Sequence, residues 1–391
     1  MAAWRRDDRA TVALVALFGL GFRLLALGGG PDLSSDLRRY LWDGRVQAAG
    51  FSPWAMPPSD PRLAALVDAE AGPATINRPG AVTVYPPGAQ AWFRLLHDVG
   101  VRTTGGLRRV AVGADLATLA LLLALLARLG VPRGRLALWA WSPLAIAETA
   151  VSAHLEALLV PLVLGALLVG ETAADDPRAS RRTIAAGGLL GAASLIKLWP
   201  ALLLAALPPA RRRLAAATAG GLFLVAYLAW LPRAGAGVLG FLPRYFRSGE
   251  DFNLALRGFL AQALASPLGR AARPTAMALC AVALLAAIAV IARRRDATST
   301  VIPARDLLIA FVLLFPGPLH PWYALALVPL VAAAPSAAGM WLCATLPLSY
   351  LKYGAPDGVM PPWIPAFEFL PACALLLAGA MRARFFRRGA A

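Results

Sequence analysis

Long apolar runs constrain this chain more than any other feature. Several reach about 18 residues, which is enough to cross the roughly 30 Å hydrocarbon core of a bilayer. Clear cases are 11–27, which is apolar apart from Arg23, and 275–292. Only 15% of the 391 residues are charged, whereas soluble domains carry about 25%. The sequence therefore predicts an all-α, polytopic bundle of transmembrane helices.

Clusters of basic residues set the expected orientation of this bundle. Arg5, Arg6 and Arg9 precede the first apolar run, as expected where Lys and Arg mark cytoplasmic helix ends. The same rule explains the net charge of +17 without nucleic acid. A signal peptide would also begin this way, but no small-x-small cleavage site stands out before Asp36. We expect an uncleaved first span with its N-terminus inside.

Counting the runs in this way gives about 12 spans, in a range of roughly 10–12, with both termini inside. We expect one integral-membrane domain over 1–391, with outer loops at about 29–106, 232–270 and 351–364. Arginines flank segment 183–210 on both sides, so two short helices meeting near Lys197 fit it better than one span. Irregular backbone is tolerated there if it lines a cavity. Cys280, Cys343 and Cys373 lie in apolar runs and imply no disulfide framework.

The first outer loop begins with a predicted amphipathic helix over 34–47. On an ideal helix Asp36 and Asp43 lie about 20° apart. Arg39, Tyr40 and Gln47 share their face. A solvated helix face with Asp–Arg pairing is one interpretation. The other is that one carboxylate acts as a general base, which activates an acceptor hydroxyl.

Two arginines of this helix, Arg38 and Arg45, point about 180° away from the carboxylates on an ideal helix. They are expected to face lipid headgroups or to pair locally. Arg39 is better placed for an active face.

Further polar residues gather at outer helix ends and in outer loops. They are Tyr85, His154, Glu156, Lys197, Arg244, Arg247 and His320. Ionisable groups near membrane depth are costly, which makes them candidates for function.

Each of these candidates has a simpler interpretation as well. Lys197 either snorkels or supplies a counter-charge for a lipid phosphate. His320 either donates a hydrogen bond to a phosphate or caps a helix. His154 and Glu156 are two residues apart and could converge in a tight turn. No spacing of the H-E-x-x-H kind is present, and we predict neither a metal nor a cofactor.

Five short motifs, taken in order, resemble a known family. They are Ser35-Asp36-Leu-Arg-Arg-Tyr40-Leu-Trp-Asp43-Gly-Arg45-Val-Gln47, Thr83-Val-Tyr85-Pro86-Pro87-Gly-Ala-Gln90, His154-Leu-Glu156-Ala157, Ile196-Lys197-Leu-Trp-Pro200 and Leu319-His320-Pro321-Trp322-Tyr323. The set is similar to that of the GT-C superfamily of membrane glycosyltransferases. It most resembles the bacterial, actinobacterial type of polyprenyl-phosphate-mannose-dependent α-mannosyltransferases.

This resemblance implies a function and a set of partners. The donor would be a polyprenyl-phosphate sugar, most simply mannose, and the acceptor a glycolipid or lipoglycan. Transfer would occur with inversion at the outer face of the plasma membrane, among membrane lipids. Asp36 would be the catalytic base.

The resemblance also assigns roles to the other outer residues. Lys197, His320 and an arginine such as Arg39 or Arg244 would hold the donor phosphate. The remaining polar residues would bind substrate: Asp43, Tyr40, Tyr85, His154 and Glu156. Glu156 stands where the related pattern often has aspartate.

Two other classes of protein stay open. A transporter or flippase of a lipid-linked sugar would show inverted repeats and charges in the middle of its spans, whereas most charges here lie at one face. A non-catalytic assembly partner is the third class.

Overall fold

The computed structural model describes residues 3–29, 33–171, 177–245, 252–294 and 299–388. Within these ranges the chain is helical and has no β-strand, which confirms the all-α prediction. The chain divides into two compact units, residues 1–249 and 250–391, which are described separately. The prediction of a single domain stays a prediction.

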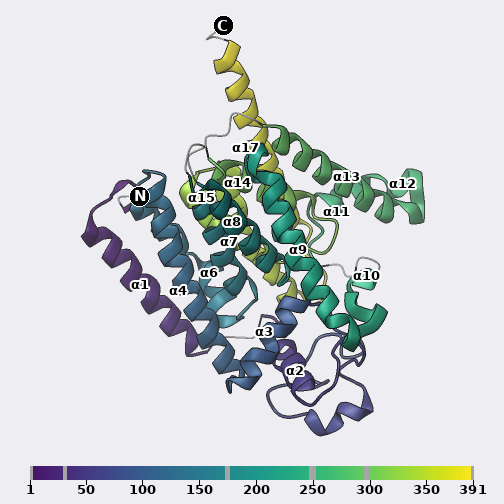
Figure 1. Cartoon of the computed structure of the whole chain (residues 1–391). Helices are drawn as coiled ribbons and strands as arrows, with labels where there is room; N and C mark the ends of the chain where they lie inside the picture. The colour runs from purple at the N-terminus through teal and green to yellow at the C-terminus, as the bar shows by residue number, and fades with distance from the viewer. Residues whose placement is uncertain (1–2, 30–32, 172–176, 246–251, 295–298, 389–391) are drawn as a thin grey trace. The chain divides into compact units, whose positions relative to one another are not determined.

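The first unit contains ten α-helices among its described residues (Figure 1). They are α1 (Arg9–Leu27), α2 (Asp36–Ala48), α3 (Pro87–Asp98), α4 (Thr104–Arg128), α5 (Ala137–Ala140), α6 (Pro143–Ile146), α7 (Glu156–Gly170), α8 (Ala179–Ser194), α9 (Pro209–Ala234) and α10 (Leu242–Tyr245). Shorter helical turns are η1 (Ala3–Arg5), η2 (Pro61–Leu66), η3 (Arg133–Leu136), the π-helical η4 (Ala147–Val151), η5 (Trp199–Ala206) and η6 (Gly235–Leu239).

The first helix shows why the chain needs a membrane. Asp8 caps α1 by accepting a hydrogen bond from the Thr11 N–H at 2.8 Å. Large apolar side chains such as Leu17, Phe18 and Leu25 are exposed along it. A continuous apolar face of this kind is not stable in water, and a span of 19 residues fits a bilayer.

An ion pair lies inside the bundle of spanning helices. The guanidinium of Arg23 on α1 pairs with the carboxylate of Asp115 on α4, and both side chains are fully buried. Asp115 also accepts a hydrogen bond from the Trp139 indole at 2.6 Å. Arg23 donates to the carbonyls of Gly19 and Ala140. The apolar first run therefore carries its single arginine inward, where α1, α4 and α5 meet.

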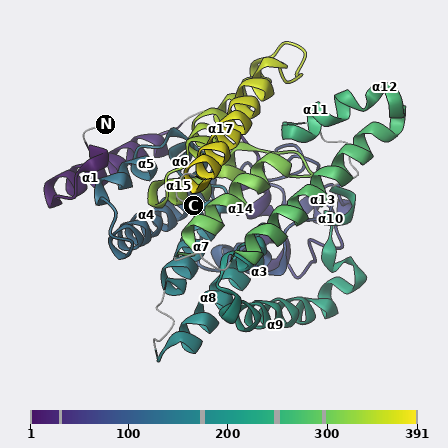
Figure 2. The same ribbon diagram turned by 90° about the horizontal axis from the view of Figure 1, so that it is seen from above.

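Small residues let α8 and α9 pack closely, as both views show (Figure 2). A Cβ atom on Gly187 would lie 2.5 Å from the Ala215 carbonyl oxygen, and one on Gly191 would lie 3.0 Å from Ala219 Cα. This is the small-xxx-small pattern of membrane helix pairs. Helix α8 ends at Ser194 and η5 begins at Trp199, so the predicted break at Lys197 is confirmed.

The segment between α1 and α4 carries the two helices α2 and α3, which pack on each other. Gly44 makes this contact possible, because a Cβ there would lie 2.4 Å from the Phe93 carbonyl oxygen. Arg38 and Arg45 both bind the loop segment 66–71: Arg38 reaches the Glu70 carbonyl at 2.9 Å, and Arg45 reaches the Leu66 carbonyl at 2.6 Å. The local-pairing interpretation of these two arginines is thus correct.

The second unit contains seven α-helices among its described residues. They are α11 (Ala255–Ala263), α12 (Ala265–Leu268), α13 (Ala272–Arg293), α14 (Val301–Leu314), α15 (Leu327–Ala333), α16 (Ala337–Thr345) and α17 (Trp363–Arg388). Shorter turns are η7 (Gly269–Ala271), η8 (Pro321–Ala324) and η9 (Leu346–Gly354). Helix α13 packs on α14, and α16 packs on α17.

Five helices in the described part of the chain are long and apolar enough to cross a membrane. They are 9–27, 104–128, 209–232, 265–293 and 363–382. Two shorter apolar helices cover 156–170 and 321–333. The chain is therefore a membrane protein, while the predicted count of about 12 spans is not confirmed by these lengths.

Candidate active site

Asp36 stands at the start of α2 with one oxygen held and the other open. The side chain is half-buried. Its Oδ1 accepts a hydrogen bond from the Asn77 side-chain amide at 3.0 Å, and Oδ2 has no hydrogen-bond partner among the described residues. The Asn77 N–H also donates to Ser35 Oγ at 3.1 Å. Asp36 is the first residue of α2, and Asn77 therefore fixes the orientation of its carboxyl group.

Asp43 lies seven residues after Asp36, on the same face of α2, and is closed off from solvent. It is 1% exposed. Its Oδ1 accepts from Arg39 Nε at 2.8 Å, and its Oδ2 accepts from Gln90 Nε2 at 2.7 Å. Gln90 also donates to Thr83 Oγ1 at 2.8 Å, and Gln47 donates to Gln90 Oε1 at 2.7 Å. This network joins α2, α3 and the Thr83 segment, so Asp43 and Arg39 both contact protein groups.

Two tyrosines, Tyr40 and Tyr85, lie within the electrostatic field of Asp36. Tyr40 stacks on Phe93 with ring centroids 4.8 Å apart and meets Tyr85 edge-on at 5.3 Å. Burial raises the pKa of both phenols well above the ordinary value, and the Asp36 carboxylate raises both further. Glu156 acts on the pKa of Tyr40 in the same direction. Both hydroxyls therefore stay protonated; Tyr40 lies within the field of two carboxylates, and Tyr85 within that of Asp36.

Glu156 and Lys197 form an ion pair at the helix break. Glu156 is the first residue of α7, and its Oε1 accepts from Lys197 Nζ at 2.6 Å. Glu156 is fully buried, and its Oε2 has no hydrogen-bond partner among the described residues. The Lys197 side chain is 13% exposed. The pair thus offers a carboxylate oxygen without a hydrogen-bond partner among the described residues and a lysine side chain that is partly exposed.

The backbone explains how Lys197 reaches this place. The Ala89 N–H on α3 donates to the Leu195 carbonyl at 3.1 Å. A Cβ on Gly88 would come within 2.7 Å of Leu195 Cβ, so only glycine fits there. The Thr83–Gln90 motif and the Ile196–Pro200 motif are therefore side by side.

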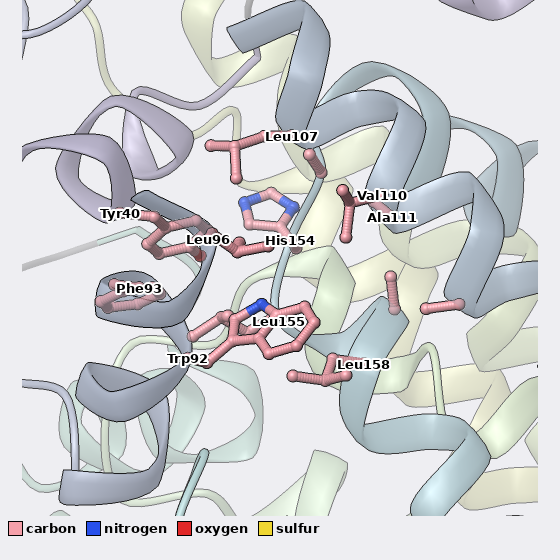
Figure 3. A pocket seen from close by; sticks show the side chains of 13 residues that line it. Tyr40, Trp92, Phe93, Leu96, Leu107, Val110, Ala111, His154, Leu155 and Leu158 are labelled. Carbon is pink, nitrogen blue, oxygen red and sulfur yellow. The ribbon is translucent and has the colours of Figure 1, made fainter. Parts of the chain in front are cut away.

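His154 has a partner that the sequence did not suggest. Its Nδ1 lies 2.7 Å from Glu148 Oε2, and both side chains are fully buried. The His154 N–H also donates to the Glu148 carbonyl at 2.9 Å. Ala153 between them has φ of 49°, which strains a residue with a side chain. Figure 3 shows the His154 ring between Tyr40 and the α4 residues Val110 and Ala111.

The predicted basic residues fall into different settings. Arg244 on α10 is exposed. The Phe241 N–H just before it donates to the Thr83 carbonyl at 2.8 Å, and Arg78 lies over the Phe241 ring at 5.3 Å. Arg247 lies outside the described residues.

His320 belongs to the second unit. Its ring is stacked between Phe252, at 4.3 Å, and Trp322, at 4.2 Å. The Leu319 N–H donates to the Asn253 carbonyl at 2.7 Å and fixes this strand-like contact. Its predicted action on the same phosphate as Lys197 stays a prediction.

Four of the five predicted motifs thus meet in the first unit: those of Asp36, Tyr85, His154 and Lys197. Sequence reasoning missed Asn77, Glu148 and Gln90. Each is a single polar residue without a periodic or spacing signal, although Gln90 did lie within a quoted motif. No group of three or more His, Cys, Asp or Glu in the described part of the chain could hold a metal.

Carboxylates and a lysine lie close together in this helical membrane protein. Such a cluster of ionisable groups is typical of a membrane enzyme. A sequence model for glycosyltransferase family 87 matches residues 83–316, which is more than half of the chain. The chain therefore belongs to glycosyltransferase family 87. No curated protein and no solved structure matches it. The matched region contains Tyr85, His154, Glu156 and Lys197, and it begins after α2 and ends before His320.

Proposed function

We propose that this glycosyltransferase takes a hexose, with mannose as the first sugar to test, from a polyprenyl-phosphate donor. The acceptor is a glycolipid or lipoglycan at the outer face of the plasma membrane. The observation that carries the proposal is the Asp36 carboxylate, held by Asn77 through one oxygen and open at the other. An open, oriented carboxylate at a helix N-terminus is a suitable general base.

The reaction follows from this placement. Asp36 takes the proton of the acceptor hydroxyl while the acceptor oxygen attacks the anomeric carbon. The bond from that carbon to the phosphate oxygen breaks, and polyprenyl phosphate leaves with the electron pair. One displacement inverts the anomeric carbon. The leaving phosphate needs stabilisation of its charge more than it needs a proton.

Lys197 is the first candidate for that stabilisation. It stands in the break between α8 and η5 with its amine partly accessible. Because Glu156 already balances its charge, a phosphate there needs a second cation. Arg244 on the exposed α10 is the candidate for it within the same unit, and the role of His320 stays the one expected from the sequence.

A transporter or flippase of a lipid-linked sugar is the alternative. The broken segment around Lys197 favours it, since discontinuous helices line transport sites. Membership of a glycosyltransferase family favours transfer.

The deciding experiment uses the purified full chain with polyprenyl-phosphomannose and a membrane glycolipid extract. The parent should transfer sugar, and Asp36→Asn should lower the rate by about 10² to 10⁴-fold, as expected for loss of a general base. Asp98→Asn is the matched control, because Asp98 is an exposed carboxylate on α3 that pairs with Arg94. Full activity of Asp36→Asn would show that another group is the base. Movement of labelled donor across proteoliposomes without transfer would favour the transporter.

A further inference from the structure

A small cavity lies between α2, α3, the first turns of α4 and the turn that precedes α7 (Figure 3). It measures about 30 Å³, which is space for one or two groups of the size of water. Most of its lining is apolar, with Leu96, Leu107 and Val110 among the residues. The side-chain polar atoms come from Tyr40, His154 and the Trp92 indole.

The Tyr40 hydroxyl is the first sign of a ligand. The side chain is 2% exposed, and its Oη makes no hydrogen bond of good geometry among the described residues, although the Tyr85 hydroxyl and the Leu155 backbone lie close enough to lower its pKa. A buried hydroxyl without a partner is destabilising, so such a group usually meets water or a ligand. Because burial raises its pKa, the phenol keeps its proton and can donate it in a hydrogen bond.

The His154 ring is the second sign. Glu148 Oε2 lies 2.7 Å from Nδ1, so in the neutral ring the proton lies on Nδ1 and Nε2 is the acceptor. Glu148 is part of a π-helical turn, which is a rare geometry often found at functional sites. The side-chain contact and the backbone hydrogen bond to the Glu148 carbonyl hold His154 twice.

The charges around the cavity select the kind of ligand. Neither lysine nor arginine is among the residues that line it. The Asp36 and Glu156 carboxylates act on Tyr40 from outside. An anionic phosphate would meet these carboxylates without a counter-charge, whereas a neutral hydroxyl group matches one donor and one acceptor.

The spacing along α2 connects the cavity to the base. Asp36 and Tyr40 are four residues apart, so their Cβ atoms lie about 5–6 Å from each other on one face of the helix. This is close to the width of one pyranose ring. The Asp36 carboxylate also acts on the pKa of the Tyr40 phenol, so a sugar hydroxyl bound at Tyr40 lies within the field of the proposed base.

We propose that this cavity is a hydroxyl subsite for the carbohydrate substrate, in which Tyr40 Oη donates to, and His154 Nε2 accepts from, a single sugar hydroxyl. Glu148 is a positioning residue that acts through His154. The proposal deepens the transferase function above and rests on it. It adds a specificity element that is separate from the phosphate site.

The test compares the parent with Tyr40→Phe on a panel of monodeoxy donor and acceptor sugars. One deoxy position should lower kcat/KM of the parent at least 10-fold, because a site built for a hydroxyl rejects the analogue that lacks it. Tyr40→Phe should lower kcat/KM for the complete sugar by a similar factor. On that one deoxy analogue it should cause less than a threefold further loss. Tyr227→Phe on α9 is the matched control and should leave every value unchanged.

A loss of rate that is equal for all analogues would show that Tyr40 is structural, and it would overturn the subsite while the transferase function stands. A parent that transfers no sugar from any polyprenyl-phosphate donor would overturn both proposals.

A second measurement does not depend on transfer. The chain has three histidines, so ¹⁵N-histidine labelling gives three imidazole rings, and the His154→Gln variant identifies the ring of His154. The neutral ring should carry its proton on Nδ1 in the parent and lose this preference in Glu148→Gln. A proton on Nε2 in the parent would overturn the subsite as described.

Discussion

Two of the buried ion pairs in the described part of the first unit differ in how completely they are closed. Arg23 and Asp115 are both fully buried, and the Trp139 indole and two backbone carbonyls take up further donors and acceptors. Glu156 and Lys197 are also paired. Here, however, Glu156 Oε2 has no hydrogen-bond partner among the described residues, and the lysine is partly exposed.

This difference distinguishes an ion pair that stabilises the fold from an ion pair that can take part in the reaction. A buried charge must be paired and hydrogen-bonded to be tolerated. A pair that satisfies itself has nothing left to offer a ligand. A pair with an open oxygen and an accessible amine is costly to keep, and a substrate can complete it. We therefore expect the closed pair to matter for stability and the open pair for transfer.

Breaking the closed pair should have the largest effect. Arg23→Met leaves the Asp115 charge without its partner, and we expect the free energy of unfolding to fall by about 3–5 kcal/mol. Denaturant unfolding of the purified protein in detergent measures it. The double variant Arg23→Met with Asp115→Leu should regain most of the loss, because the unpaired charge is gone. A single variant as stable as the parent would mean that closure of this pair stabilises nothing.

Breaking the open pair should affect the rate instead. Lys197→Met removes the cation proposed to face the leaving phosphate, and we expect kcat to fall about 10²-fold or more. Its unfolding free energy should change less than that of Arg23→Met. Lys197→Arg, which keeps the charge, is the control and should retain part of the activity. A stable, fully active Lys197→Met would remove the distinction between the two pairs.

Asp43 tests whether the hydrogen-bond partners of a carboxylate or its place on α2 decide if it serves stability or substrate binding. It lies in the same helix, α2, as Asp36, but Arg39 and Gln90 occupy both of its oxygens. We expect Asp43→Asn to lower the free energy of unfolding by about 1–3 kcal/mol and to leave KM for the donor unchanged. Steady-state kinetics on the folded fraction give the answer. A raised KM with unchanged stability would instead favour the substrate-binding role predicted from the sequence.

The exposed pair of Asp60 and Arg62 should have the smallest effect. The hydrogen bond from Arg62 lowers the pKa of Asp60 from 3.8 to about 2. Because the folded pKa is lower than the unfolded one, this contribution is present above about pH 4 and is lost as the pH falls through 2. Carboxyl ¹³C titration of the parent and of Arg62→Gln measures it. The pKa of Asp60 in the variant should rise toward 3.8 but stay below it, because the backbone N–H of residue 62 still donates to the carboxylate. Stability at neutral pH should be unchanged within error, since exposed pairs contribute little.

The local features of this fold could be predicted from the sequence. The helix over 34–47 follows from its periodicity, and the break at Lys197 follows from arginines on both sides of one apolar segment. The apolar run over 11–27 predicted the membrane-spanning length of α1. These signals depend on neighbours along the chain, which the sequence contains directly.

The partners of the polar residues could not be predicted in the same way. Asn77 reaches Asp36, Glu148 reaches His154 and Asp115 reaches Arg23 only after the helices have packed. Helical periodicity placed Arg39 and Asp43 on the same face as Asp36, but it could not show that α3 would cover them. The span count depends on short helices such as α15 and α16, whose lengths alone do not assign them to a membrane.

The hydrogen bond between Ala89 and Leu195 has a consequence for biogenesis. It ties the loop that supports α2 to a segment that the ribosome makes only after α4, α7 and α8. This hydrogen bond therefore cannot form until Leu195 has been synthesised. The proposed base is among the first parts of the enzyme to be synthesised, and this support for its loop is added later. An arrest of translation before Leu195 would leave it without that support.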